Sequence, residues 1–167
     1  VDDADFPRGF DYLAQYPNLL VSRTFSKAYG LAALRVGYAA SHPAIADALN
    51  RVRQPFNVNS LALTAACAAL ADQDYLQRSR ELNSAGMAQL EQGFARLGLQ
   101  WIPSRGNFIA VDLGREAAPV YQGLLREGVI VRPVANYGMP QHLRVTIGLE
   151  QENHRFLDAL QQVLARV

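Results

Sequence analysis

The feature that most constrains the fold is a long helical pattern between Asp72 and Leu97, in which apolar residues recur at helical spacing over about seven turns. Gly98 follows directly, and glycine commonly ends helices. The apolar positions of the pattern are Leu76, Leu82, Met87, Leu90, Phe94 and Leu97. A helix of this length can join two domains. We therefore expect a boundary inside it near residue 90, between one domain at 1–90 and another at 91–167.

Shorter apolar segments alternate with helical ones on both sides of this helix, which indicates an α/β fold. Before it, we expect buried strands at 19–22 and 36–40, a helix at 43–53, and a buried helix at 60–70 capped by Ser60. After it, we expect strands at 99–102, 107–113, 129–131 and 143–147, and helices at 116–127 and 150–165. This second part should form a small α/β domain that covers one face of a sheet.

The composition excludes several classes of function. Half of the 167 residues are hydrophobic, and 16 Lys and Arg against 15 Asp and Glu give a net charge of +1. A nearly neutral chain has no field that attracts nucleic acid or a membrane surface, and the apolar run at 61–70 is too short to span a bilayer. The single cysteine, Cys67, excludes a disulfide framework, and the lack of a signal peptide predicts a cytoplasmic location.

The usual motifs of metal and nucleotide sites are also missing from the sequence. The three histidines, His42, His142 and His154, share no metal-ligand spacing with Cys67 or with one another. The chain contains no Gly-x-Ser-x-Gly, Gly-x-Gly-x-x-Gly or Walker motif. We therefore expect no metal, and neither a hydrolase nor a nucleotide-binding protein.

The most informative motif surrounds Lys27, which lies between hydroxyl residues and has an arginine eight residues later. A lysine that forms a Schiff base needs a partly desolvated setting beside a cation, because this lowers its pKa from the usual value of about 10.4. Thr24 and Ser26 can donate hydrogen bonds to a phosphate, and the guanidinium of Arg35 can bind the same phosphate through two N–H groups. The cofactor that fits this set is pyridoxal phosphate.

The run from Arg23 to Tyr38 resembles the pattern R-T-x-S-K-A-(F/Y)-G-L-A-G-x-R-x-G-(F/Y) of the histidinol-phosphate aminotransferase family, within the fold-type I pyridoxal-phosphate aminotransferases. It departs once, at Ala33, where the family usually has glycine; the methyl should cost little unless the backbone needs a positive φ. Segments at 54–60, 103–108, 128–133 and 143–148 resemble later landmarks of the family, in its order. The family's enzymes are about twice this length. The resemblance thus implies a C-terminal half: the end of the large cofactor-binding domain, with the Schiff-base lysine, and a small α/β domain.

A second candidate site centres on Arg144, which lies in an otherwise apolar strand where a charge must find a partner. The resemblance implies that Arg144 binds the anionic end of the substrate, that Arg132 assists it, and that Asn107 lies near the substrate. Taken without the resemblance, Arg144 could pair with a neighbouring acid, and Asn107 could be an ordinary turn residue after glycine. Two arginines suit a phosphate dianion and remain adequate for a carboxylate.

The resemblance also implies partners and a reaction. The reaction would be histidinol phosphate plus 2-oxoglutarate to imidazole acetol phosphate plus glutamate, in histidine biosynthesis. The loop with Phe56, Asn57 and Asn59 is similar to the one that approaches the partner subunit's site, which implies a homodimer; a plain connecting loop is the alternative. A pyridoxal-phosphate decarboxylase of phosphorylated amino acids would use the same Lys27, Arg35 and Arg144. An aromatic aminotransferase and a non-catalytic folding or dimerisation module also remain open.

The first five residues, Val-Asp-Asp-Ala-Asp, superficially resemble the family's Asp-Glu-Ala-Tyr motif, whose aspartate pairs with the pyridinium nitrogen. Asp5 stands where the motif has tyrosine, and an ionised acid cannot donate the tyrosine's hydrogen bond. The acids are followed by Pro7 and Gly9, which favours a loop beyond the motif. We therefore expect this chain to fold but to be inactive alone.

Overall fold

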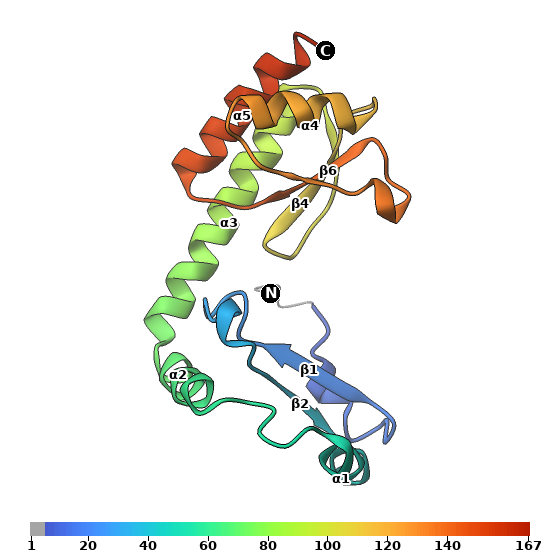
Figure 1. The fold of residues 1–167 in the computed structure, drawn as a ribbon, viewed down its shortest axis with the longest axis vertical. Helices are drawn as coiled ribbons and strands as arrows, with labels where there is room; N and C mark the ends of the chain where they lie inside the picture. The colour runs from blue at the N-terminus through green and yellow to red at the C-terminus, as the bar shows by residue number, and fades with distance from the viewer. Residues whose placement is uncertain (1–5) are drawn as a thin grey trace. The chain divides into compact units, whose positions relative to one another are not determined.

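The computed structural model describes residues 6–167 (Figure 1), so the interpretation of the first five residues, including Asp2, lies outside the described part. The chain divides into two compact units, Val1–Arg80 and Glu81–Val167. The long helix α3, Gln73–Arg96, begins in the first unit and ends in the second. Both this division and the boundary expected near residue 90 fall within α3. The helix ends where Gly98 adopts a positive φ of 71°, as the glycine predicted.

The first unit contains one antiparallel pair of strands. Its elements are the 3-10 turn η1 (Gly9–Tyr12), β1 (Leu20–Thr24), the 3-10 turn η2 (Ala32–Leu34), β2 (Gly37–Ser41), α1 (Pro43–Val52) and α2 (Ser60–Ala71). The register pairs Leu20 with Ser41 and Thr24 with Gly37. Both expected strands are present, but the expectation that they are buried is wrong, because only Val21 of the pair is buried. Among the described residues this sheet has two strands, so most of its side chains lack neighbours to cover them.

The helix α2 differs from the expectation in two ways. Its cap is Asn59, whose side-chain oxygen accepts a hydrogen bond from the Ala62 N–H at 2.8 Å, and not Ser60. Its burial is also less than expected, because only Ala62 and Ala66 are buried and Cys67 is exposed. The two alanines pack with Phe25 and Val36, and the other faces of this apolar helix stay open.

The second unit is a four-stranded antiparallel sheet with three helices. Its remaining elements are β3 (Gln100–Ile102), β4 (Phe108–Asp112), α4 (Ala117–Arg126), β5 (Arg132–Pro133), the 3-10 turn η3 (Ala135–Tyr137), β6 (His142–Thr146) and α5 (Glu150–Leu164), in the sheet order β3-β4-β6-β5. The strand expected at 129–131 is wrong. The Val129 N–H donates to the Leu124 carbonyl at 2.9 Å and Gly128 has a φ of 75°, so this stretch ends α4 and pairing begins only at Arg132.

The core of the second unit lies between one face of the sheet and the helices α3, α4 and α5 (Figure 1). Residues of β4 and β6 alternate between two faces, and the core-facing pairs are Ile109 with Val145 and Val111 with Leu143. The helices contribute Leu90, Phe94, Val120, Leu124, Phe156, Leu157 and Leu160. The opposite face of the sheet carries Phe108, Ala110, Asp112, His142, Arg144 and Thr146. The expected small α/β domain is therefore confirmed, and its register places Arg144 on the face opposite the core.

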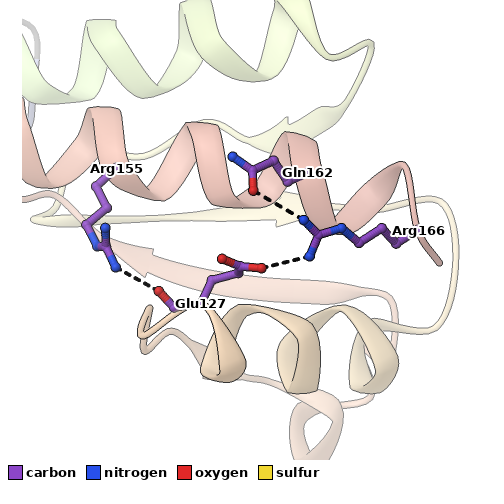
Figure 2. A network of polar contacts seen from close by, with 4 residues as sticks. All are labelled: Glu127, Arg155, Gln162 and Arg166. Atoms are coloured by element: carbon purple, nitrogen blue, oxygen red, sulfur yellow. Dashed lines mark hydrogen bonds and ion pairs between the residues drawn. The ribbon is translucent and has the colours of Figure 1, made fainter.

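Close approach and polar contacts hold these helices together. A Cβ on Gly93 of α3 would lie 2.5 Å from the Leu157 side chain of α5, so a larger residue there would force the buried Leu157 side chain to shift. At the end of α4, the Glu127 carboxylate binds Arg166 at 2.8 Å and its carbonyl accepts a hydrogen bond from Arg155 at 2.8 Å (Figure 2). The buried Asn153 is fully used, because it bonds Gly148 N–H and carbonyl and also donates to the Gln89 side chain.

Two further properties concern the described residues only. Across 6–167, no helix combines the length and the apolar character needed to cross a bilayer. In the same range, no three side chains of His, Cys, Asp or Glu gather in the way that a metal ion would require.

Candidate active site

The lysine loop, residues 25–36, joins β1 to β2. The Phe25 N–H donates to the Val36 carbonyl at 3.2 Å, which extends the strand ladder by one step beyond the pair Thr24 and Gly37. The Leu31 N–H donates back to the Phe25 carbonyl at 2.9 Å, and the Gly30 N–H closes a turn on the Lys27 carbonyl at 2.8 Å. Phe25 and Val36 are buried at the base of the loop, so its two ends are fixed against the unit's small core.

The ladder brings together the residues that the sequence analysis assigned to the cofactor. Ser26 follows Phe25 and Arg35 precedes Val36, so these two residues leave neighbouring strands at the same end of the pair. The Ser26 N–H donates to Thr24 Oγ1 at 3.0 Å, which shapes the start of the loop and leaves the Thr24 hydroxyl free to donate. Lys27 is exposed, so the described chain does not by itself form the desolvated setting that we expected around this amine.

Arg35 has an unusual backbone. Its φ of 53° and ψ of 40° are left-handed, where an L-residue with a side chain costs roughly 1–2 kcal/mol more than in right-handed conformations. Its guanidinium donates to the Ala32 carbonyl at 2.7 Å. Strained backbone of this kind gathers at functional sites, and nothing in the sequence predicted it here. Ala33, the single departure from the family pattern, does not have a positive φ, which agrees with a low cost for its methyl.

The second group of candidate residues lies on the open face of the sheet in the second unit, the face opposite the core. Arg144 of β6 stands directly opposite Arg132 of β5. Two like charges in such a cross-strand pair repel, and no ion pair joins either arginine to an acid within the described part of the chain. The pairing with a neighbouring acid that we considered for Arg144 is therefore not formed among these residues.

The contacts of the two arginines involve aromatic residues that the sequence analysis missed. The Arg144 guanidinium carbon lies 4.9 Å from the centroid of the Phe108 ring, and its Nε is buried without a hydrogen-bond partner. Arg132 Nη2 donates a long hydrogen bond of 3.5 Å to the Tyr137 hydroxyl. The signal for Phe108 was available in the sequence, because strand alternation places it on the same face as Arg144.

Asn107 lies at the edge of this face, just before β4. Its carbonyl accepts a hydrogen bond from the Ile147 N–H at 3.0 Å, so its backbone belongs to the end of the β4–β6 ladder. The turn before it is closed by the Gly106 N–H, which donates to Ser104 Oγ at 3.1 Å. The role of its side chain toward a substrate stays a prediction.

The lysine loop has the donors that pyridoxal phosphate requires. The amine of Lys27 suits an aldehyde, and the hydroxyls and the guanidinium suit a phosphate. Neither Lys27 nor Arg35 forms an ion pair with an acid within residues 6–167, so both positive charges are available to a ligand. The donor set and the free charges therefore fit the group.

Comparison with known proteins identifies the family to which the chain belongs. The family model described as aminotransferase class I and II matches residues 2–160. Histidinol-phosphate aminotransferase 2 of Pseudomonas fluorescens strain Pf-5 is 77% identical over 165 residues, which are 99% of this chain and 45% of that protein. The enzyme of the same name from Pseudomonas aeruginosa strain PAO1 is 76% identical over 161 residues, 96% of this chain and 44% of that protein.

Solved structures support the same assignment. The histidinol-phosphate aminotransferase of Sinorhizobium meliloti, solved in complex with pyridoxal-5'-phosphate, superposes with a TM-score of 0.81 at 35% identity, over 90% of this chain and 42% of that one. The chain thus spans less than half the length of these relatives. The expected fold class and the resemblance are both confirmed, and the chain belongs to the class I and II aminotransferase family.

Proposed function

We propose that this chain is part of a pyridoxal-phosphate-dependent histidinol-phosphate aminotransferase, which converts histidinol phosphate and 2-oxoglutarate to imidazole acetol phosphate and glutamate. The observation that carries the proposal is the cross-strand pair of Arg132 and Arg144, which have no acid partner among the described residues. A phosphate dianion would neutralise both charges and remove their repulsion, whereas one carboxylate would neutralise half. The names of the relatives that this chain resembles agree with such a substrate.

The lysine loop would hold the cofactor in this proposal. When bound, pyridoxal phosphate supplies an electron sink for the charge that develops at the substrate carbon. The guanidinium of Arg35 and the hydroxyls of Thr24 and Ser26 would bind its phosphate. The Lys27 amine would attach the cofactor and, once released, would take the proton from the amine-bearing carbon of the substrate. The exposed position of Lys27 leaves its amine open to a ligand.

We also propose how the chain is organised in the larger protein. Residues 1–90 would belong to the large cofactor-binding domain, and residues 91–167 would form the small domain that binds the substrate's anionic end. Asn107 would lie beside that substrate. Alone, the chain would neither hold the cofactor firmly nor catalyse, because it would bind one side of the phosphate only.

A homodimer in the cytoplasm completes the proposal. The support for self-association is Phe56, which is 97% exposed and has a strained φ of 55°, and the exposed Leu61 and Leu63 of the neighbouring α2. Apolar side chains grouped in this way mark contact surfaces.

The test uses a chimera in which this chain replaces the 165 matching residues of the Pseudomonas fluorescens relative. Arg144→Ala should lower kcat/KM for histidinol phosphate by about 13- to 150-fold, or about 1.5–3 kcal/mol, the usual contribution of hydrogen bonds to a charged group. Arg144→Lys should recover part of the loss, because an ammonium lacks the planar fork. An unchanged kcat/KM in Arg144→Ala would refute the assignment. Release of CO₂ from a phosphorylated amino acid would favour the decarboxylase instead.

The role of Lys27 has its own test. Borohydride reduction of the cofactor-loaded chimera, followed by peptide mapping, should place the label on Lys27. A label on any other lysine would overturn this part of the proposal.

A further inference from the structure

The Arg144 side chain has two diagonal neighbours on β4 that it could contact, and it contacts Phe108. The register puts Arg144 of β6 directly opposite Ala110 of β4, so the diagonal neighbours of Arg144 on that strand are Phe108 and Asp112. Both diagonal positions are within reach of a long side chain. Ala110 is small and leaves room for the arginine to lie either way. An ion pair with Asp112 would be the ordinary outcome for a cation on a sheet face.

In the structure, Arg144 contacts Phe108 and forms no ion pair with Asp112. The Arg144 guanidinium carbon lies 4.9 Å from the Phe108 centroid, whereas the Asp112 carboxylate is used by other groups. One Asp112 oxygen accepts a hydrogen bond from the Gly114 N–H at 2.9 Å, and the other lies 3.9 Å from His142 Nε2. The contacts with Gly114 and His142 therefore hold the Asp112 carboxylate away from Arg144. Within residues 6–167, no carboxylate neutralises Arg144.

Contact with an aromatic face has a different consequence for Arg144 than an ion pair would have. A ring attracts the cation without accepting the in-plane N–H donors, so these remain available for a bidentate anion. An ion pair with Asp112 would occupy the same donors. The Arg144 guanidinium is in this way fixed in position while its terminal N–H groups stay free to bind an anion, on the same face as Arg132.

We propose that Phe108 is a positioning residue for the substrate-binding arginine: its ring holds Arg144 away from Asp112, so that the guanidinium meets the phosphate of the substrate together with Arg132. This inference rests on the proposed function. Phe108 itself is 40% exposed and is not part of the buried core, so its replacement should leave the unit folded. The ring acts on recognition of the phosphate and not on the reacting carbon.

The first experiment measures kcat/KM of the chimera for histidinol phosphate and for histidinol, which lacks the phosphate. Phe108→Leu should lower the ratio of the two values by about 3- to 30-fold, the range set by cation–π contacts from partly exposed to desolvated sites. Phe108→Tyr keeps a ring and should restore the ratio. The matched control is Ile102→Leu, which lies on the same face and is 47% exposed. It should not change the ratio.

The outcomes separate the two proposals. A purely structural role would reduce both kcat/KM values together, and an unchanged ratio in Phe108→Leu would overturn the inference. If Arg144→Ala lowers the ratio while Phe108→Leu does not, the proposed function survives and the role of Phe108 is wrong. If Arg144→Ala also leaves the ratio unchanged, phosphate recognition by this face fails, and the inference fails with it.

A second measurement uses the 167-residue chain itself and does not depend on activity. In the NMR spectrum of this chain, the ring current of Phe108 should shift the Arg144 Nε–H proton upfield. The shift should disappear in Phe108→Leu and persist in Phe108→Tyr. A resonance at the ordinary arginine position in the unsubstituted chain would overturn the inference even if Phe108→Leu did not fold.

Discussion

Replacing Arg35 separates the stability of the lysine loop from its binding capacity. The left-handed backbone at Arg35 costs roughly 1–2 kcal/mol for any residue with a Cβ, and glycine adopts this conformation without that cost. Both Arg35→Gly and Arg35→Ala remove the hydrogen bond from the guanidinium to the Ala32 carbonyl. The difference in stability between the two variants therefore measures the cost of the left-handed backbone at this position.

We expect Arg35→Gly to be more stable than Arg35→Ala by about 1 kcal/mol, because the greater freedom of glycine in the unfolded chain offsets part of the relieved strain. Relative to the unsubstituted chain, the stability of Arg35→Gly should change by no more than about 0.5 kcal/mol in either direction, since the lost exposed hydrogen bond contributes about 0.5–1.5 kcal/mol. The chain has two compact units. The loop should therefore be followed locally, by hydrogen exchange of the Phe25 and Leu31 amides that close it.

Cofactor binding should weaken in both variants, even where the stability of the loop is kept. Neither variant retains the guanidinium, so in the chimera both should bind pyridoxal phosphate more weakly to a similar degree, measured by equilibrium titration of its absorbance. Arg35→Gly would then have slower amide exchange in the loop than Arg35→Ala, and also weaker cofactor binding than the unsubstituted chimera. Equal exchange rates in Arg35→Gly and Arg35→Ala would refute the argument from backbone strain, and undiminished affinity would refute the role of Arg35 at the phosphate.

Three further predictions concern packing and assembly. Asn59→Ala should destabilise α2 by about 1 kcal/mol in denaturant unfolding, whereas Ser60→Ala should change little, because only the Asn59 side chain caps the helix. Gly93→Ala should destabilise the second unit by about 1–2 kcal/mol, since its Cβ would meet Leu157, and Leu157→Ala in the same chain should remove the clash. The 167-residue chain should self-associate in light scattering, and Leu61→Lys should reduce that association; a clean monomer of the unsubstituted chain would contradict it.

The sequence predicted those parts of the fold that depend on local periodicity. The helix from Gln73 to Arg96 was predicted because its apolar spacing persists over many turns and ends at glycine. The strand at 129–131 was not correctly predicted, because a short apolar run suits a helix end as well as a strand, and the positive φ of Gly128 decided between them. Asn59 and Ser60 are both good caps, and only the structure shows which side chain reaches the Ala62 N–H.

The candidate residues of the lysine loop are close together in the sequence, whereas the arrangement of Arg132 and Arg144 depends on strand pairing. Thr24, Ser26 and Lys27 lie within four residues of one another, so the motif alone was enough to propose them as a site. Arg132 and Arg144 face each other only because of the register between β5 and β6. A shift of one residue would place the two side chains on opposite faces of the sheet. The left-handed backbone of Arg35 has no sequence signal, because arginine is not a residue that favours positive φ.

Both candidate sites share one physical property, although they are built on different strand pairs in different units. In each, arginine is kept from the acids that would ordinarily pair with it: Arg35 bonds a backbone carbonyl, and Arg144 lies over a ring. At Arg144 this leaves a buried Nε without a hydrogen-bond partner, which is unfavourable in an isolated fold, whereas Arg35 is exposed and water can hydrate its donors. The left-handed backbone of Arg35 and the unpartnered Nε of Arg144 are both unfavourable for the stability of the chain. Because such costs gather at functional sites, we propose that an anion binds at each of the two arginines.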